Sequence, residues 1–310
     1  MEEKKAKRKM ILKRILMILA GALILYALAM TFVPVAVLSG TVNRRYDYKN
    51  QEEEEREGQY VTTSDGERLW MKICPGEEPK GVIIFLSGLS GPAVTEFQAH
   101  ADWVNELGFA AVLLELRAHG LSGGDQIGLG YKETEDIRAA LAEIRKDPVL
   151  SSVPVYLFGV SMGASSALVA FGELPEIAGA AALSPYASFE EQFEIRMKRA
   201  LVPPLSRLYV GFLVGTFLDD TYGEEAVLTK NPREEIQKAA GRPVLLIASK
   251  GDRKVPCENT LYLRELYPEA DLWIREGNAH LVVSGNDLKN LRNDPEYLAK
   301  IEEWLEKITR

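Results

Sequence analysis

A strand-to-helix segment at residues 153–172 constrains the fold of this chain more than any other feature. An apolar, β-branched run leads directly into Gly159-Val160-Ser161-Met162-Gly163, and a run of small, helix-compatible residues follows. Glycines two positions before and after the serine let a sharp turn close and let the helix pack tightly against neighbouring strands. The segment therefore predicts a nucleophile elbow that holds the hydroxyl of Ser161 above the end of a buried strand.

A second match to the same pattern tests this interpretation. Chance alone produces G-x-S-x-G in roughly one sequence in ten of this composition, so the pattern needs structural context. Gly120-Leu121-Ser122-Gly123-Gly124 also matches, but a glycine-rich loop follows it where an elbow requires a helix. Only Ser161 combines a strand before it with a helix after it.

Strand and helix patterns alternate through the rest of the chain. A hairpin is expected at residues 60–63 and 68–73, and the continuous apolar run at 81–86 is typical of a strand buried on both faces. Further strands are expected at 110–114, 153–158, 177–183, 243–248 and 271–274, and helices at 94–107, 137–144, 258–266 and from Pro295, with Asp294 as N-cap. This alternation predicts an eight-stranded, mostly parallel α/β sheet with helices on both faces.

Residues 185–242 interrupt the alternation. They separate two strands by a segment that is too long for a simple crossover helix, and residues 201–218 are rich in Leu, Val, Phe and Tyr. We interpret the insertion as a helical cap. Its apolar side chains either pack against the catalytic domain or line an acyl-binding pocket.

The N-terminal residues predict a membrane anchor. Residues 1–14 carry seven Lys or Arg and two Glu, and residues 15–38 are uncharged and mostly apolar, long enough to cross a hydrocarbon core of about 30 Å. The basic cluster places the N-terminus in the cytoplasm and the catalytic domain outside it. The alternative is a secreted protein, cleaved from a signal peptide after Ala27-Leu28-Ala29.

Residues 39–59 are polar and acidic and predict a solvated linker.

Net charge argues against nucleic acid as a partner, and the spacing of cysteines and histidines argues against a zinc site. Since the whole chain carries −8 and the basic segment +5, the remaining residues carry −13, which argues against nucleic acid. Cys74 and Cys257 form no C-x-x-C pair, and the three histidines show no zinc-ligand spacing. We expect two unpaired thiols, no metal and no other cofactor.

A serine nucleophile needs a general base, and the base needs an acid that orients it. After an elbow the partners follow in the order acid, then histidine, and His280 is the only histidine after Ser161. The segment 248–252 follows the apolar run 244–247, and Asp252 at its end is the expected acid, with Glu190 as the alternative. The backbone N–H groups of Met162 and Leu89 are the expected oxyanion donors, and glycines at 88 and 91 allow the tight path of the second loop.

The region from residue 60 to 310 resembles the α/β-hydrolase superfamily. Residues 115–123, Glu-Leu-Arg-Ala-His-Gly-Leu-Ser-Gly, resemble the D-x-R-G-x-G-x-S loop after the fourth strand of its esterase and serine-aminopeptidase-like members. The anchor and short cap resemble bacterial relatives of the Bem46 and ABHD-type hydrolases. Glu115 and Ala118 depart from the Asp and Gly of that loop, and Ser87 stands where many members have histidine. The strand order of the family also implies that the two cysteines lie too far apart for a disulfide.

The resemblance implies a membrane-anchored serine hydrolase that cleaves a small, lipophilic acyl ester through an acyl-enzyme. A thioesterase or peptidase on the same triad is the alternative within enzymes. An aminopeptidase would need an acidic group in the cap, for which the candidates are Glu190, Glu191, Glu194, Asp219 and Asp220. A catalytically silent, membrane-bound binding protein is the alternative of another class. It would require a broken triad, and no expected triad residue is missing.

Overall fold

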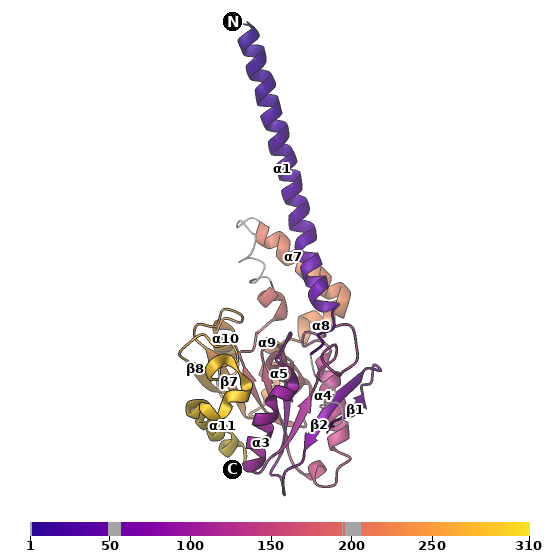
Figure 1. Cartoon of the computed structure of the whole chain (residues 1–310), viewed down its shortest axis with the longest axis vertical. Helices are drawn as coiled ribbons and strands as arrows, with labels where there is room; N and C mark the ends of the chain where they lie inside the picture. The colour runs from indigo at the N-terminus through magenta and orange to yellow at the C-terminus, as the bar shows by residue number, and fades with distance from the viewer. Residues whose placement is uncertain (1, 49–56, 194, 196–205) are drawn as a thin grey trace.

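The structure is a computed structural model that describes residues 2–48, 57–193, 195 and 206–310. One long helix, α1 (Glu2–Val42), rises from an α/β domain that holds the rest of the described chain (Figure 1). The C-terminus lies at the end of the domain opposite α1. Helix α1 is long and apolar enough to cross a membrane.

A single sheet of eight strands organises the domain, in the order β1-β2-β4-β3-β5-β6-β7-β8. Strand β2 runs antiparallel to both of its neighbours, and the other pairs are parallel. The strands are β1 (Gln59–Thr62), β2 (Arg68–Cys74), β3 (Val82–Leu86), β4 (Ala110–Leu114), β5 (Val155–Val160), β6 (Ile177–Leu183), β7 (Val244–Ser249) and β8 (Asp271–Arg275). The sequence-based prediction of an eight-stranded, mostly parallel sheet is confirmed.

Helices cover both faces of this sheet because the central strands are apolar on both sides. In β3, Ile84 packs into the cluster that contains α4 (Glu133–Ile144), α5 (Met162–Glu173) and α10 (Glu258–Leu266). Its neighbours Ile83 and Phe85 pack on the opposite face with α3 (Gln98–Glu106) and α11 (Pro295–Ile308). The predicted N-cap of α11 is confirmed, because the side chain of Asp294 accepts a hydrogen bond from the N–H of Tyr297 at 3.1 Å.

The insertion between β6 and β7 is helical, as predicted. Its described part contains α7 (Ser206–Tyr222), α8 (Glu224–Thr229), α9 (Pro232–Glu235) and the short 3-10 helix η3 (Ile236–Ala239). Other 3-10 turns are η1 (Val94–Phe97), η2 (Leu150–Ser152), η4 (Ser284–Asn286) and η5 (Leu288–Asn293). The apolar residues 201–205 of the predicted cap lie outside the described residues.

The two cysteines are buried and unpaired, as predicted.

The linker prediction is wrong for its first half. Helix α1 continues to Val42, and the chain after it pairs with the loop that follows β4: Tyr46 donates to the carbonyl of Ala118 at 2.9 Å and accepts from Gly120 at 2.8 Å. The guanidinium of Arg45 also donates to the carbonyls of Gly120 and Ser122, both at 2.5 Å. The polar residues that suggested a solvated tether therefore satisfy the backbone of the catalytic domain. Residues 49–56 of the predicted linker lie outside the described residues.

Candidate active site

Ser161 lies at the turn between β5 and α5, where its backbone is held at φ 55° and ψ −120°. The flanking glycines are required by close packing. A Cβ at Gly159 would lie 2.3 Å from the carbonyl oxygen of Gly163, and a Cβ at Gly163 would lie 2.4 Å from that of Ser87. The turn therefore has the sharp geometry that the sequence predicts for an elbow.

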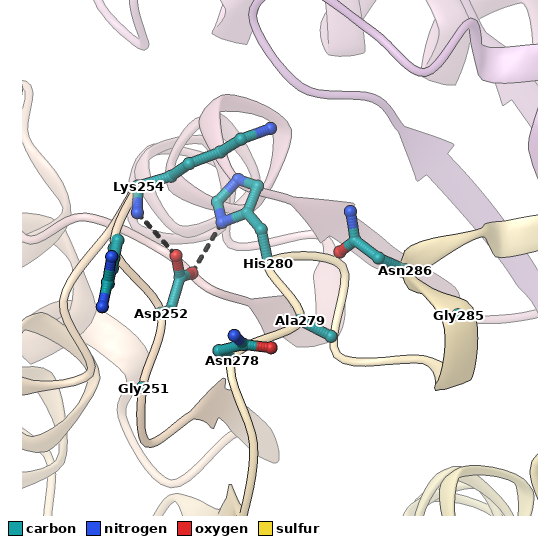
Figure 2. A pocket seen from close by; sticks show the side chains of 9 residues that line it. Gly251, Asp252, Lys254, Asn278, Ala279, His280, Gly285 and Asn286 are labelled. Carbon is teal, nitrogen blue, oxygen red and sulfur yellow. Dashed lines mark hydrogen bonds and ion pairs between the residues drawn. The ribbon is translucent and has the colours of Figure 1, made fainter.

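His280 and Asp252 come from the loops that follow β8 and β7. Their side chains meet with Nδ1 of His280 2.6 Å from Oδ2 of Asp252 (Figure 2). The other carboxylate oxygen, Oδ1, accepts from the backbone N–H groups of Lys254 at 2.7 Å and Val255 at 3.2 Å. Burial alone would raise the pKa of Asp252, but the hydrogen bond from His280 and those from the two backbone groups outweigh it and hold this pKa below its usual value. An ionised Asp252 thus faces the imidazole at neutral pH.

Three hydrogen bonds hold the two loops in place. Gly251 N–H donates to the carbonyl of Gly277 at 2.7 Å, and the hydroxyl of Ser249 donates to the carbonyl of Ala279 at 2.6 Å. The hydroxyl of Ser184, at the end of β6, donates to the carbonyl of His280 itself at 2.8 Å. Consequently the ends of three parallel strands determine where the imidazole lies.

Ser161 and His280 line one cavity of about 110 Å³. Leu89 and Met162, the expected oxyanion donors, line the same cavity, and Met162 is the first residue of α5, where backbone N–H groups lack helical partners. From the stem of the cap, the cavity is lined by Tyr186, Phe189 and Gln192. The structure therefore brings together all five sequence-predicted residues: Ser161, His280 and Asp252 with Leu89 and Met162.

Lys254 is the one Lys or Arg among the described residues that line the cavity. Lys254 lines the cavity, and in Figure 2 its side chain extends past the imidazole of His280. No described residue that lines this cavity is a carboxylate. The residues that the structure describes also contain no group of three or more His, Cys, Asp or Glu side chains arranged to hold a metal ion.

A family model described as serine aminopeptidase, S33, matches residues 77–243, slightly more than half of the chain. The chain belongs to this α/β-hydrolase family. It is also similar to the protein YqkD of Bacillus subtilis (strain 168), with 26% identity over 238 residues that cover 76% of this chain and 73% of YqkD.

Two solved esterases share the fold of this S33-family chain. The Pyrococcus furiosus esterase Pf2001 is 21% identical with a TM-score of 0.61, over 86% of this chain and 97% of Pf2001. Est1E of Butyrivibrio proteoclasticus, solved with ferulic acid bound, is 22% identical with a TM-score of 0.58, over 81% of this chain and all of that one. The family match supports a hydrolase of the serine-hydrolase type, and the two neighbours show that the fold is shared.

Within the S33-family fold, His119 contacts the loop that carries Leu89, an interaction that we did not predict from the sequence. Its Nε2 lies 2.7 Å from the carbonyl oxygen of Leu89, and its Nδ1 lies 2.7 Å from that of Arg117. The ring is fully buried and stacks on Tyr46 at a centroid distance of 5.5 Å. The sequence offered one indication of this contact, because His119 lies in the loop that resembles the family pattern. That pattern does not reveal which backbone group the imidazole contacts.

The second G-x-S-x-G match of this S33-family chain has a structural role. Ser122 is fully buried, and its hydroxyl donates to the carbonyl of Glu115 at 2.6 Å and accepts from the N–H of Trp70 at 2.9 Å. In the same loop Ala118 has φ 58°, a left-handed conformation that favours glycine. This backbone conformation explains why the family loop pattern has glycine at the position of Ala118.

None of the described acidic cap residues lines the cavity. Glu191 pairs with Arg233 at 2.5 Å, and a Cβ at Gly215 of α7 would lie 3.3 Å from the carboxylate of Glu190. Asp219 and Asp220 lie near the C-terminal end of α7. Glu194 lies outside the described residues.

Replacing His119 by Ala is expected to lower kcat for an ester by about 10- to 100-fold, because a displaced Leu89 peptide would no longer aim its N–H at the oxyanion. KM should change less than about 3-fold, since few substrate contacts are lost. His119→Gln should recover part of kcat, because an amide N–H can still donate to Leu89. Steady-state kinetics measure both constants, and a thermal melt controls for folding. An unchanged kcat in a folded His119→Ala protein would remove this role.

Proposed function

We propose that the chain is a serine esterase of the carboxylesterase or lipase type that works through an acyl-enzyme. The 2.6 Å contact between Asp252 and His280, at a cavity that Ser161 lines, is the observation that carries this proposal. A serine hydroxyl is a weak nucleophile at neutral pH, and an imidazole held by a buried carboxylate is the base that activates it.

The proposed reaction has two halves. In the first, Ser161 Oγ attacks the ester carbonyl, His280 Nε2 takes the hydroxyl proton, and the N–H groups of Met162 and Leu89 stabilise the oxyanion. The imidazolium then protonates the leaving alcohol. In the second half, His280 removes a proton from water, the hydroxide attacks the acyl-enzyme, and Ser161 leaves with the proton. Asp252 holds the imidazole and stabilises its positive form throughout.

The charge at the cavity favours an ester over an aminopeptidase substrate. A free amino terminus is cationic and would meet Lys254, whereas no described lining residue offers it a carboxylate. Of the candidate acids in the cap, Glu190, Glu191, Asp219 and Asp220 do not line the cavity, and Glu194 lies outside the described residues. The names of Pf2001 and Est1E, both esterases, point the same way.

A substrate panel tests this proposal. We expect p-nitrophenyl esters to be hydrolysed at least about 100-fold faster, by kcat/KM, than aminoacyl p-nitroanilides, a difference of about 2.7 kcal/mol in transition-state stabilisation. Thioesters belong in the same panel. Faster cleavage of the anilides would replace the esterase by an aminopeptidase. Within the esters, a preference for palmitate over acetate would support an acyl-binding cap, and activity confined to acetate would remove it.

We also propose that α1 is retained as a single membrane anchor, with its N-terminus in the cytoplasm and the catalytic domain outside. The seven basic residues before Ile15 support this orientation. The burial of Leu38 and Val42 in the domain core packs the end of the anchor against the catalytic domain. The alternative is cleavage after Ala29. Measurement of the intact mass distinguishes the two, because the cleaved protein would be lighter by the mass of its first 29 residues.

A further inference from the structure

In the part of the chain that the structure describes, the buried residues of α1 all lie in its last third. Its buried residues lie four positions apart on one side of the helix: Met30, Pro34, Leu38 and Val42. None of residues 4–29 is buried. Among the residues that the structure describes, the buried side chains of α1 therefore begin at Met30.

The part of α1 that precedes its first buried residue, Met30, is too short to cross a bilayer by itself. The last charges before the apolar run are Lys13 and Arg14, so the uncharged part before Met30 comprises residues 15–29. At about 1.5 Å per residue these span about 22 Å, whereas a hydrocarbon core is about 30 Å thick. If α1 crosses the membrane, as proposed above, roughly five more residues must be immersed, which places the far edge of the hydrocarbon near Pro34.

Helix α7 lies beside this immersed, packed part of α1 (Figure 1). The hydroxyl of Thr31 donates to the carbonyl of Ala27 at 2.9 Å and lies 2.8 Å from the hydroxyl of Tyr209 in α7. One side of α7, formed by Val210, Val214 and Leu218, belongs to the same apolar cluster as Leu38 of α1. Any bilayer that covers Thr31 therefore also covers Tyr209.

The opposite side of α7 changes from apolar to charged along the helix. Its exposed residues at four-residue spacing are Leu208, Phe212, Thr216 and Asp220. Leu208 is 88% exposed and Phe212 is 68% exposed, although both are large and apolar. A helix whose exposed side is apolar at one end and acidic at the other matches a segment that enters the hydrocarbon with the first end and leaves it with the second.

We propose that the N-terminal half of α7 is embedded in the leaflet on the domain side of the bilayer that α1 crosses. The partner is lipid hydrocarbon, which covers Leu208, Tyr209 and Phe212 while Asp220 stays in water. Because the cap stem residues Phe189 and Gln192 line the cavity, this contact also holds the cavity at the lipid surface. The proposed ester would then be drawn from the bilayer.

Depth measurements on the full-length protein in phosphatidylcholine vesicles test the insertion. Single cysteines carrying a nitroxide label are introduced as Leu208→Cys, Phe212→Cys, Thr216→Cys and Asp220→Cys, in a Cys74→Ser, Cys257→Ser background. Ile24→Cys in α1 is the lipid reference. Glu276→Cys is the water reference, since that side chain is 82% exposed and lies on the loop after β8. The measured quantity is the ratio of collisions with oxygen, which concentrates in hydrocarbon, to collisions with a water-soluble nickel chelate.

At positions 208 and 212 the ratio should match that at position 24, and at position 220 it should match that at position 276. Water-like values at 208 and 212, with a lipid-like value at 24, would overturn the insertion and leave the anchor standing. A water-like collision ratio at position 24 would overturn both the membrane anchor and the insertion of α7. If neither oxygen nor the nickel chelate reaches the labels at 208 and 212, protein such as a second copy covers the exposed side of α7. That result would also overturn the proposed insertion into lipid. No turnover is measured, so failure of the esterase proposal gives a separate result.

A second arm tests the position of the cavity. Leu208→Asn with Phe212→Asn should lower hydrolysis of a long-chain ester carried in vesicles by about 10-fold and leave that of soluble p-nitrophenyl acetate unchanged. Thr216→Asn, on the same side of α7, is the matched control and should change neither rate. Since all three side chains are exposed or nearly so, folding should be unaffected. Equal rates on the vesicle-borne ester in the double variant and the control would overturn the lipid-surface position of the cavity.

Discussion

Ser161→Ala protein is expected to lose labelling by a fluorophosphonate probe and to lose about 10⁶-fold in kcat on an ester that the wild type hydrolyses. The probe forms a covalent bond only with an activated hydroxyl, and in the structure Ser161 shares its cavity with the one histidine that follows it in the chain. Labelling intensity on a gel and steady-state hydrolysis of p-nitrophenyl acetate measure the two effects.

Ser90→Ala is the matched control, because Ser90 is another serine that lines the same cavity. It should keep wild-type labelling. Equal labelling of the wild type and Ser161→Ala would sink the assignment of the nucleophile. A wild type that is folded, but that neither labels nor hydrolyses any ester, thioester or amide, would favour the silent binding protein.

Asp252→Asn should lower kcat by about 10⁴-fold, because the amide enforces the wrong imidazole tautomer. Two backbone N–H groups, from Lys254 and Val255, donate to Oδ1 of Asp252. These donors would keep the amide oxygen of the variant in that position and turn its NH₂ group toward Nδ1 of His280. The imidazole would then accept at Nδ1 and carry its proton on Nε2, where it cannot act as a base. Single-turnover acylation kinetics with p-nitrophenyl acetate report this step directly.

Glu190→Gln separates the two candidate acids. It should keep kcat within about 3-fold of the wild type, since the carboxylate of Glu190 lies against α7 and Asp252 contacts the imidazole. If Asp252→Asn were nearly normal and Glu190→Gln were severely impaired, the orienting role would pass to Glu190. A thermal melt of each variant excludes unfolding as the cause.

The elements that carry the site were predictable because their signals are local. The elbow at Ser161 depends on glycines two residues away and on apolar runs that adjoin them, so a short window of sequence contains the necessary information. The closing helix is similar, since Asp294 and Pro295 mark its start within two positions. The alternation of strand and helix patterns, together with the right-handed connections of α/β sheets, then constrains the fold.

The contacts that join distant segments were beyond the reach of the sequence. Composition indicated a solvated linker after α1, but Tyr46 pairs with a loop more than 70 residues later, and only the folded backbone reveals which carbonyls need a donor there. His119 was likewise only a loop residue until its Nε2 was seen beside the carbonyl of Leu89. The choice between Asp252 and Glu190 depended on one distance to His280.

By itself the sequence determined an α/β sheet with a serine elbow, a histidine that chain order singles out and an apolar N-terminal segment, because residue pattern and order encode each of them. Only the tertiary structure decided which carboxylate meets the imidazole, how His119 contacts the loop that carries Leu89 and how α1 packs on the cap. These depend on angstrom-scale placement of side chains that lie tens to hundreds of residues apart in the chain. Such placement comes from packing of the whole core rather than from any local pattern.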